Sequence, residues 1–441
     1  MTTEEFIHEN ADGDIRALAL KHAGRTDIDL AYALDQIAGH RKARTKLPRW
    51  AAHDGIIYPP HISMEQCSSE QTARYKAAVA ARLLKELPGS PSTAPHNPTT
   101  GNQITENPDN LITPKPSNPT TLIDLTGGFG VDFSYMAPLF GRAVYIERQS
   151  HLCDVSRHNM AELGITQAEV ICGDCEQIIE ATAHADMIYA DPARRDSHGG
   201  RTFAIADCTP DLLSMKDMLL EKASYVMIKL SPMLDWRKAA ADMGVHVGEV
   251  HIVAVGNECK ELLLVMSARY SGLSRIYCVN DDDTFTFTPD EAASAVAAGG
   301  TTAGDDGAEG QPPAYLYEPN AALMKAGCFA LTARRYGVRQ ISRDSHLYVS
   351  HEKTDRFPGR TFAIRAVTTM NKRELKAALA GTERANVSVR NFPLSADALR
   401  RKLRLKDGGD TYIFGTTTAD GHHVLFICTK DMPADNKTDA F

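Results

Sequence analysis

Short runs of apolar residues, each followed by a helical pattern of apolar and polar positions, occupy the middle of the chain. The runs lie at 121–125, 143–147, 169–172, 185–190 and 225–230. Strands that alternate with helices predict an α/β fold with a parallel sheet and right-handed crossovers. Two further runs, 249–255 and 261–266, are separated by a short Gly256-Asn257 turn and predict an antiparallel hairpin at the sheet edge.

Helical patterns dominate residues 1–87. One helix is expected to begin after Thr26 or Asp27 and to end before Pro48, and a second to open at Ser68-Ser69-Glu70. These segments predict an N-terminal helical domain, which could equally pack as a cap on the neighbouring domain or bind substrate. Residues 88–119 are rich in Pro, Asn, Thr and Ser, and we expect them to form a flexible insertion because they cannot bury enough apolar surface.

The last third of the chain has shorter elements. Residues 271–287 have strand patterns, and 289–313 form a second low-complexity insertion rich in Ala, Gly and Asp. A helix is expected over 321–336, and strands and helices alternate from 361 onward. The pattern over 367–431 predicts a small α+β module whose basic helix begins at Ser395, followed by a tail at 432–441.

Composition excludes several classes of protein. The 441 residues are 43% hydrophobic and 24% charged, as in ordinary globular chains of several domains. No apolar run reaches the roughly 18 residues of a membrane span, and the acidic first residues lack the pattern of a signal peptide. Nine scattered cysteines, an odd number, favour a reducing cytoplasm.

The net charge of −8 conceals an uneven distribution. Residues 314–411 contain 19 Lys and Arg against 9 Asp and Glu, an excess of 10 positive charges. A basic C-terminal part in an acidic chain favours a polyanionic partner, a class that includes nucleic acid. A solvated basic surface without a partner is the alternative.

A glycine-rich turn follows the first apolar run. Asp124 ends the run, and Thr126-Gly127-Gly128-Phe129-Gly130 precedes the next helical pattern. The dinucleotide fingerprint does not fit, because Phe133 stands where its third glycine belongs. D-x-T-G-G-x-G instead resembles motif I of the class I S-adenosylmethionine-dependent methyltransferases, and the carboxylate suits the positively charged amino group of that cofactor. A nucleotide-binding turn and an ordinary α/β turn are the alternatives.

Acidic residues end four successive predicted strands or lie just past them. They are Asp124, Glu147, Asp174 and Asp191. Ligands of open α/β sheets bind outside the carboxyl ends of the strands, where these side chains should gather. Glu147 falls about where a carboxylate accepts hydrogen bonds from ribose hydroxyls.

The loop Asp191-Pro192-Ala193-Arg194-Arg195 follows the fourth strand. Its position resembles that of the Asp/Asn-Pro-Pro-aromatic motif of methyltransferases that modify amines, in which the polar side chain orients the acceptor amine. Here Ala193 replaces the second proline and Arg194 the aromatic residue. The two arginines favour a phosphate contact instead.

Several motifs together resemble one bacterial family. They are D-x-T-G-G-x-G-x-D, the Asp191 loop, and the segments Gln66–Glu70, Lys229–Asp235, Tyr317–Asn320, Phe357–Arg360 and Arg390–Gly409. The family consists of class I methyltransferase-like proteins with an added ferredoxin-like segment and a C-terminal THUMP-like domain. The resemblance implies a Rossmann-like seven-stranded methyltransferase sheet over 120–270, a ferredoxin-like segment over 271–366 and a THUMP-like domain over 367–431. Because THUMP domains bind structured RNA, it also implies RNA, with tRNA the expected substrate.

The resemblance implies roles for individual residues. Asp124, Thr126, Gly127, Gly128 and Gly130 would surround the methionine part of S-adenosylmethionine, Glu147 would hold its ribose and Asp174 its adenine amine. The methyl-transfer site would contain Asp191, Pro192, Arg194, Arg195 and Lys229. RNA phosphates would be bound by Arg390, Arg400, Arg401, Lys402 and Arg404.

These features predict a cytoplasmic methyltransferase that transfers a methyl group from S-adenosylmethionine to a base nitrogen of RNA, without a metal. Cys172-x-x-Cys175 has the spacing of a metal site, but no second pair accompanies it. A methyltransferase of proteins or small molecules and a non-catalytic RNA-binding protein with the same fold are the alternatives. The sequence does not determine the oligomeric state.

Overall fold

The computed structural model describes residues 1–87, 120–194, 205–298 and 312–430. The predicted insertion at 88–119, Arg195 and the tail lie outside these ranges. The chain forms two compact units, one of Met1–Val255 with Lys260–Ser274 and the other of Gly256–Cys259 with the chain from Arg275 onward.

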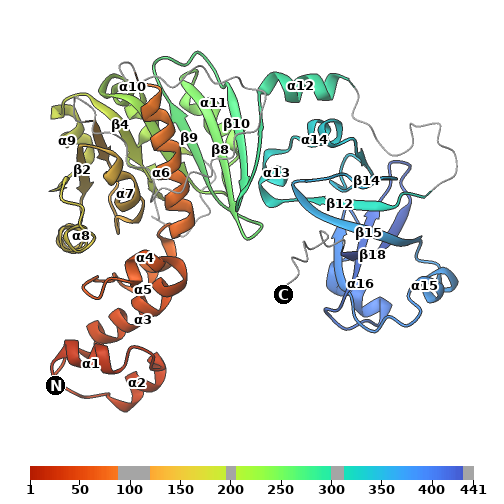
Figure 1. The fold of residues 1–441 in the computed structure, drawn as a ribbon, viewed down its shortest axis with the longest axis horizontal. Coiled ribbons are helices and arrows are strands. Elements are labelled where there is room, and N and C mark those ends of the chain that lie inside the picture. Colours follow the sequence, from red (N-terminus) through yellow and green to blue (C-terminus); the bar gives the residue numbers. More distant parts are fainter. Residues whose placement is uncertain (88–119, 195–204, 299–311, 431–441) are drawn as a thin grey trace, which may run out of the picture. The chain divides into compact units, whose positions relative to one another are not determined.

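The first unit is built on a large, mostly parallel sheet (Figure 1). Its strands lie in the order β8-β9-β7-β4-β1-β2-β3. The bounds are β1 (Thr121–Asp124), β2 (Arg142–Glu147), β3 (Ala168–Cys172), β4 (Ala185–Ala190), β7 (Ala223–Leu230), β8 (Val247–Val255) and β9 (Glu258–Met266). Pairs β1–β2, β2–β3, β1–β4 and β4–β7 are parallel, and β9 is antiparallel to β7. The predicted α/β fold is thereby confirmed.

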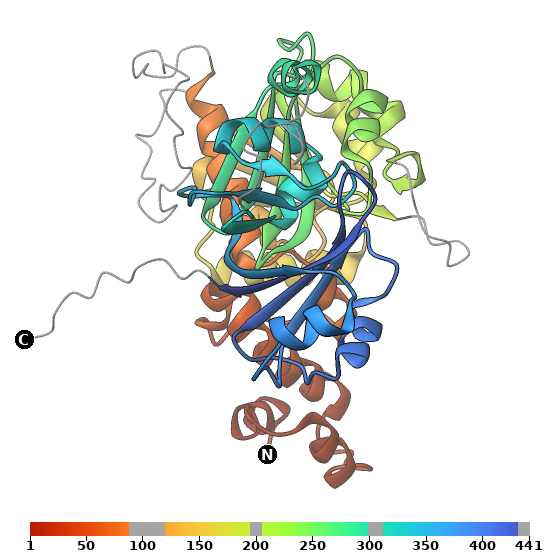
Figure 2. The same cartoon turned by 90° about the vertical axis from the view of Figure 1, so that its right-hand side faces the viewer.

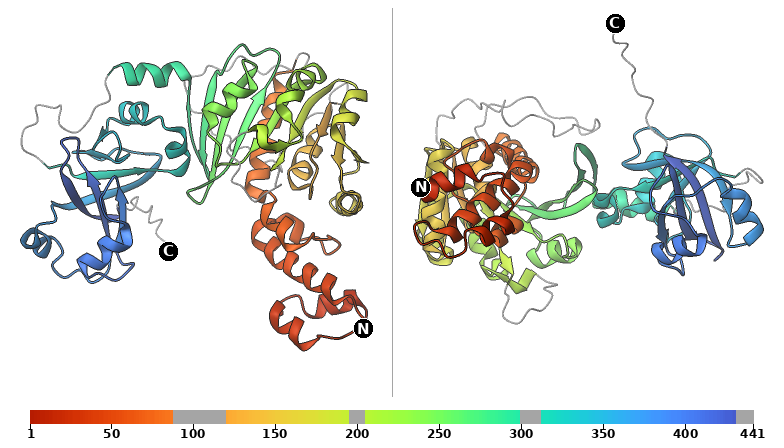
Figure 3. Two further views of the ribbon diagram at one scale, coloured as in Figure 1. Left: turned by 180° about the vertical axis from the view of Figure 1, so that it is seen from behind. Right: turned by 90° about the horizontal axis from the view of Figure 1, so that it is seen from below.

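Helices cover both faces of this sheet (Figures 1 and 3). They are α7 (Val131–Met136), α8 (Ser150–Glu162), α9 (Cys175–Ala181), α10 (Leu212–Lys222) and α11 (Trp236–Met243). Asp174, Asp211 and Asp235 cap α9, α10 and α11 by accepting a hydrogen bond from a backbone N–H group of the first turn. The predicted Gly256-Asn257 turn has positive φ at both residues, as a two-residue hairpin turn requires.

The N-terminal segment consists of α1 (Thr3–Glu9), α2 (Ile15–Lys21), α3 (Leu30–Lys46), α4 (Pro48–Ala51), α5 (His61–Gln66) and α6 (Glu70–Lys85). The region predicted as one helical domain has two parts. Phe6, Leu18 and Ile37 belong to a small separate core. By contrast, buried residues from Ala43 to Leu83 share one core with the sheet, and Trp50 Nε1 donates to Ser134 Oγ of α7 (3.1 Å). Helix α6 is therefore an integral part of the sheet's core.

The second unit contains a sheet, drawn in shades of blue in Figure 2. Its strands lie in the order β13-β14-β12-β15-β18-β17-β16. The bounds are β12 (Tyr315–Pro319), β13 (Arg339–Gln340), β14 (Tyr348–Ser350), β15 (Gly359–Thr368), β16 (Asn386–Arg390), β17 (Thr411–Thr417) and β18 (His423–Lys430). The accompanying elements are β10 (Arg275–Asn280), β11 (Asp283–Phe287), α13 (Ala321–Ala326), α14 (Phe329–Tyr336), α15 (Lys372–Ala378) and α16 (Ala396–Leu403). A domain boundary at residue 366, as the sequence suggested, falls inside β15.

Two expectations for this unit need correction. Residues Pro289–Ala297, predicted to begin a low-complexity insertion, form helix α12, because Thr288 and Glu291 make a capping box and Pro289 occupies the first turn. The helix predicted over 321–336 is two helices, since Gly327 adopts a left-handed conformation (φ 68°) that ends α13.

Candidate active site

The glycine turn is held in place by backbone and side-chain hydrogen bonds. Asp124 Oδ1 accepts from the N–H of Thr126 (2.9 Å), and Gly127 N–H donates to Ile146 O (2.8 Å). A Cβ atom at position 127 would lie 2.2 Å from Tyr145 Cζ, so only glycine fits there. Gly128 and Gly130 have positive φ values (60° and 82°), which glycine adopts without strain. The glycine turn is therefore fixed both by its own residues and by contacts with β2.

Asp124 is buried at the end of β1, with 2% of its surface exposed. Burial, together with the nearby Asp132 and Asp191 carboxylates, raises its pKa to about 8, against the hydrogen bonds from Thr126. A positively charged group bound beside Asp124 would favour its ionised form. The position therefore suits a cation.

Glu147 ties the turn to β2. Its Oε2 accepts from the N–H of Gly128 (2.9 Å) and its Oε1 from the N–H of Gln149 (2.8 Å). Asp174 is exposed and caps α9, accepting from the N–H of Glu176 (2.9 Å). Both carboxylates lie just where their strands end, and both already support local structure.

The Asp191 loop contacts the glycine turn directly. The N–H of Asp191 donates to Thr126 Oγ1 (2.6 Å), and its carboxylate, 40% exposed, pairs with Lys229 at the end of β7 (2.6 Å between Oδ2 and Nζ). Pro192 follows, and the backbone of Arg194 lies in the short strand β5 (Ala193–Arg194), paired with β6 (Cys208–Thr209). The structure thus brings together Thr126, Asp191 and Lys229.

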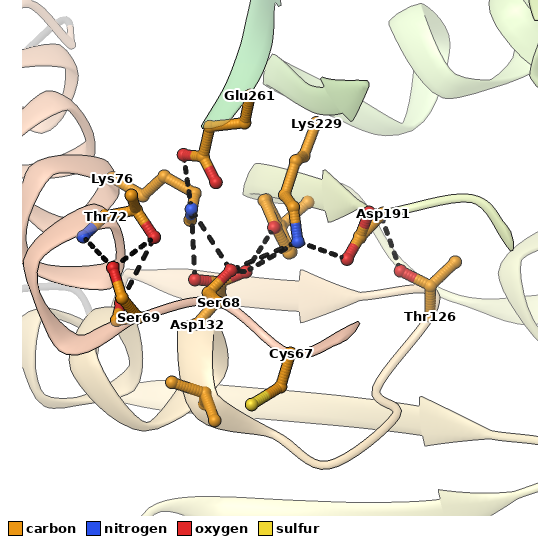
Figure 4. Close-up of polar contacts among 12 residues, drawn as sticks. Cys67, Ser68, Ser69, Thr72, Lys76, Thr126, Asp132, Asp191, Lys229 and Glu261 are labelled. Carbon is orange, nitrogen blue, oxygen red and sulfur yellow. Dashed lines mark hydrogen bonds and ion pairs between the residues drawn. The ribbon is translucent and has the colours of Figure 1, made fainter. Parts of the chain in front are cut away.

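Lys229 also faces a second carboxylate, that of Asp132 on α7 (Figure 4). Its Nζ lies 3.7 Å from Asp132 Oδ2 and donates to Ser68 Oγ (3.1 Å). The hydroxyls of Ser68 and Tyr189 both donate to Asp132 Oδ2, each at 2.7 Å. Burial lowers the pKa of Lys229, but the charges of Asp191, Asp132 and Glu261 outweigh it and raise the pKa.

A second lysine closes the network from helix α6. Lys76, fully buried, lies 2.5 Å from Glu261 Oε1 of β9 and 3.2 Å from Asp132 Oδ1. Burial raises the pKa of Asp132, but Lys76, Lys229 and the hydrogen bonds from Tyr189 and Ser68 outweigh it and lower the pKa. The pKa of Glu261 is raised by burial.

Sequence reasoning assigned no role to five residues of this network, namely Ser68, Lys76, Asp132, Tyr189 and Glu261. Asp132 and Ser68 stand inside motifs that the sequence analysis quoted, so a signal was present for both. Lys76 and Glu261 lie in unremarkable helix and strand patterns. Only the fold brings them together.

The basic residues of the C-terminal part differ in their surroundings. Arg390 pairs with Glu318 (3.2 Å), and Arg400 pairs with Asp397 and Asp407 (2.6 and 2.5 Å). Arg401, Lys402 and Arg404 are exposed at the end of α16. These three side chains are the better placed to meet an anion.

Two family models match the second unit. A ferredoxin-like domain matches residues 315–358, and a THUMP domain-like model matches residues 359–430. A protein of Porphyromonas gingivalis W83, whose crystal structure is named that of a "putative methyltransferase", is 31% identical to this chain. The match covers 98% of both chains with a TM-score of 0.78. The chain belongs to this family of methyltransferase-like proteins with ferredoxin-like and THUMP-like domains.

Two proteins of Mycobacterium tuberculosis are also similar to this chain. In each of the strains CDC 1551 and H37Rv, an uncharacterised S-adenosylmethionine-dependent methyltransferase is 25% identical over 317 residues. The match covers 69% of this chain and 80% of each relative. The resemblance found in the sequence is thereby confirmed.

Neither a membrane helix nor a metal cluster is found in the ranges that the structure describes. No helix there is long and apolar enough to cross a membrane. No group of three or more His, Cys, Asp or Glu residues there could hold a metal ion.

Proposed function

We propose that this chain is an S-adenosylmethionine-dependent methyltransferase that acts on RNA, with tRNA as the expected substrate, in the cytoplasm. The hydrogen bond between Asp191 N–H and Thr126 Oγ1 (2.6 Å) carries the proposal. It joins the glycine turn, where the cofactor would bind, to the loop where the methyl acceptor would lie. Membership of the methyltransferase-like family and the THUMP-like domain support it.

The residues around the turn fit the cofactor. The amino group of S-adenosylmethionine would lie beside Asp124, a buried carboxyl group with a raised pKa that gains from a neighbouring positive charge. Glu147 ends β2 and Asp174 lies just past β3, where the ribose and the adenine would lie. S-adenosylmethionine supplies an electrophilic methyl group when bound; the protein orients the acceptor toward it.

The acceptor would lie at Asp191, Pro192, Lys229 and the two arginines of the loop. The sequence alone predicted a base nitrogen, oriented by Asp191. In the second unit, Arg401, Lys402 and Arg404, with weaker contributions from the paired Arg390 and Arg400, would bind RNA phosphates and select which RNA reaches the site.

The cofactor assignment is tested by calorimetric titration with S-adenosylhomocysteine. We expect micromolar binding by the wild type, weakened about tenfold or more in Asp124→Asn, because the variant loses the ion pair with the ligand's ammonium group. Asp186→Asn is the matched control, since Asp186 also accepts a hydrogen bond from a backbone N–H, that of Thr121 (2.7 Å). Asp186 lies at the start of β4, whereas Asp124 lies at the end of the neighbouring strand β1. Equal affinity in wild type and Asp124→Asn would contradict the assignment.

A further inference from the structure

Five charged side chains form one network beside the methyl-transfer site (Figure 4). Lys229 lies between Asp191 and Asp132, and Lys76 lies between Asp132 and Glu261. The four elements that supply Lys76, Asp191, Lys229 and Glu261 are α6, the loop after β4, the end of β7 and the start of β9. Because both ammonium groups are withdrawn from solvent and flanked by carboxylates, they are fixed in position and charge.

The position of Lys229 bears on the kind of acceptor atom. A neutral base nitrogen becomes positively charged as it receives a methyl group. An ammonium group close to it, itself withdrawn from solvent, would oppose that change. A hydroxyl oxygen instead loses its proton and carries partial negative charge in the transition state, which an ammonium group stabilises. Lys229 therefore favours an oxygen acceptor.

The hydrogen bonds of Asp191 point the same way. Oδ2 of Asp191 is held by Lys229 at 2.6 Å, so an acceptor group that is oriented by this carboxylate would lie beside the ammonium group. The loop also lacks the aromatic residue that would stack on a base, since Ala193 and Arg194 follow Pro192. A substrate that is held by its backbone does not need such stacking.

We propose that the acceptor is the 2′-hydroxyl group of an RNA ribose, with Asp191 as proton acceptor and Lys229 as the cation that stabilises the oxygen. The inference rests on the proposed RNA methyltransferase function. The 2′-hydroxyl is present in every nucleotide of RNA and absent from DNA. A basic RNA-binding domain would present it together with its flanking phosphates.

The step balances without a further reactant. The O–H bond breaks and its proton passes to the Asp191 carboxylate; the O–C bond forms as the C–S bond of the donor breaks, leaving its electron pair on sulfur. The proton then leaves Asp191 to solvent, to which this carboxylate is partly exposed. Lys76 and Ser68 act as positioning residues, because both contact Asp132, which contacts Lys229.

The location of the methyl group tests the proposal. RNA from cells lacking the gene is incubated with the full-length protein and S-adenosylmethionine carrying a deuterated methyl group, digested to nucleosides and analysed by mass spectrometry. We expect the label in the ribose fragment, and resistance of the adjoining phosphodiester to alkaline hydrolysis. Label in a base would overturn the inference and leave the RNA methyltransferase function standing. Absence of label from RNA, with S-adenosylhomocysteine binding intact, would overturn both.

Binding provides a second readout that needs no RNA. Sinefungin carries an amino group in place of the sulfonium methyl, so its ammonium would approach Lys229. We expect Lys229→Met to raise the ratio of the sinefungin affinity to the S-adenosylhomocysteine affinity about tenfold. The variant removes the repulsion between the two ammonium groups and leaves Asp191 able to pair with the ammonium group of sinefungin. Lys238→Met, which breaks an exposed pair with Asp242 on α11, is the control. An unchanged ratio would show that Lys229 does not face the methyl position.

Activity variants separate charge from shape. Lys229→Met should lower the rate constant for methylation about 100-fold or more. Lys229→Arg keeps the positive charge and should therefore retain a larger fraction of the wild-type rate constant than Lys229→Met does. Unchanged S-adenosylhomocysteine affinity in both variants would show that the cofactor site is intact. Wild-type activity in Lys229→Met would contradict the role of Lys229.

Discussion

Asp124 and Asp132 are both buried near the glycine turn, and their surroundings drive their pKa values in opposite directions. Asp132 has the ammonium groups of Lys76 and Lys229 beside it, and these hold its pKa low against the effect of burial. Asp124 accepts hydrogen bonds from Thr126, but burial raises its pKa to about 8. Of the two carboxyl groups, Asp124 is therefore the one that a positively charged ligand would stabilise more in its ionised form.

This difference predicts how cofactor affinity depends on pH. Below about pH 8, Asp124 is mostly protonated in the free protein, so binding of an ammonium group must release a proton. We expect the affinity for S-adenosylhomocysteine to rise from pH 6 to pH 8 by about tenfold or more and then to level off. Calorimetry in buffers of different ionisation enthalpy measures the released proton. Affinity that is independent of pH in the wild type, as expected for Asp124→Asn, would contradict this reading of Asp124.

At the scale of elements, the features that could be predicted from the sequence are those set by residues close together in the chain. The glycine turn, the strand-end carboxylates and the helix cap at Ser395 are local patterns, and the structure has each of them where it was expected. Lys76 was missed because its partner Glu261 is 185 residues away, and nothing local distinguishes a buried lysine on an alanine-rich helix. Burial of α6 against the sheet creates the ion pair.

The pairing of Lys76 predicts a large effect on stability. Lys76→Met leaves Glu261 and Asp132 buried without this ammonium group, which should lower the free energy of unfolding by about 3 to 5 kcal/mol. The free energy of unfolding is measured by urea denaturation, with circular dichroism as the signal. The double variant Lys76→Met/Glu261→Gln should recover part of the loss, because one buried charge is removed. Equal stability of the wild type and Lys76→Met would show that the pair is not formed.

Helix α16 allows a matched test of RNA binding. Arg401, Lys402 and Arg404 are exposed, whereas Arg400 is neutralised by Asp397 and Asp407. Replacing the three exposed residues by Glu should weaken tRNA binding and reduce the salt dependence of the binding constant, by about one unit of slope for each phosphate that the protein no longer binds. Arg400→Gln should have a smaller effect. Fluorescence titration at several salt concentrations measures both, and a larger effect of Arg400→Gln would contradict the assignment.

At the scale of the whole molecule, the excess of positive charge and the proposed methyl-transfer site lie in different units. The positive excess lies in residues 314–411, within the second unit, whereas the lysine and carboxylate network lies in the first. The order of strands and helices was predictable from hydrophobic periodicity, and the domain types from family motifs. The sharing of a core between residues 43–83 and the sheet was not, because an amphipathic helix does not reveal which surface it covers.

The most direct test is the transfer of a radiolabelled methyl group from S-adenosylmethionine to macromolecules of cells lacking the gene. Total RNA, protein and small molecules are separated after incubation with the wild type or with Asp191→Asn. We expect label in the RNA fraction of the wild-type reaction, concentrated in tRNA, and loss of this label with Asp191→Asn. Label in protein or small molecules, or no transfer to any fraction despite cofactor binding, would contradict it.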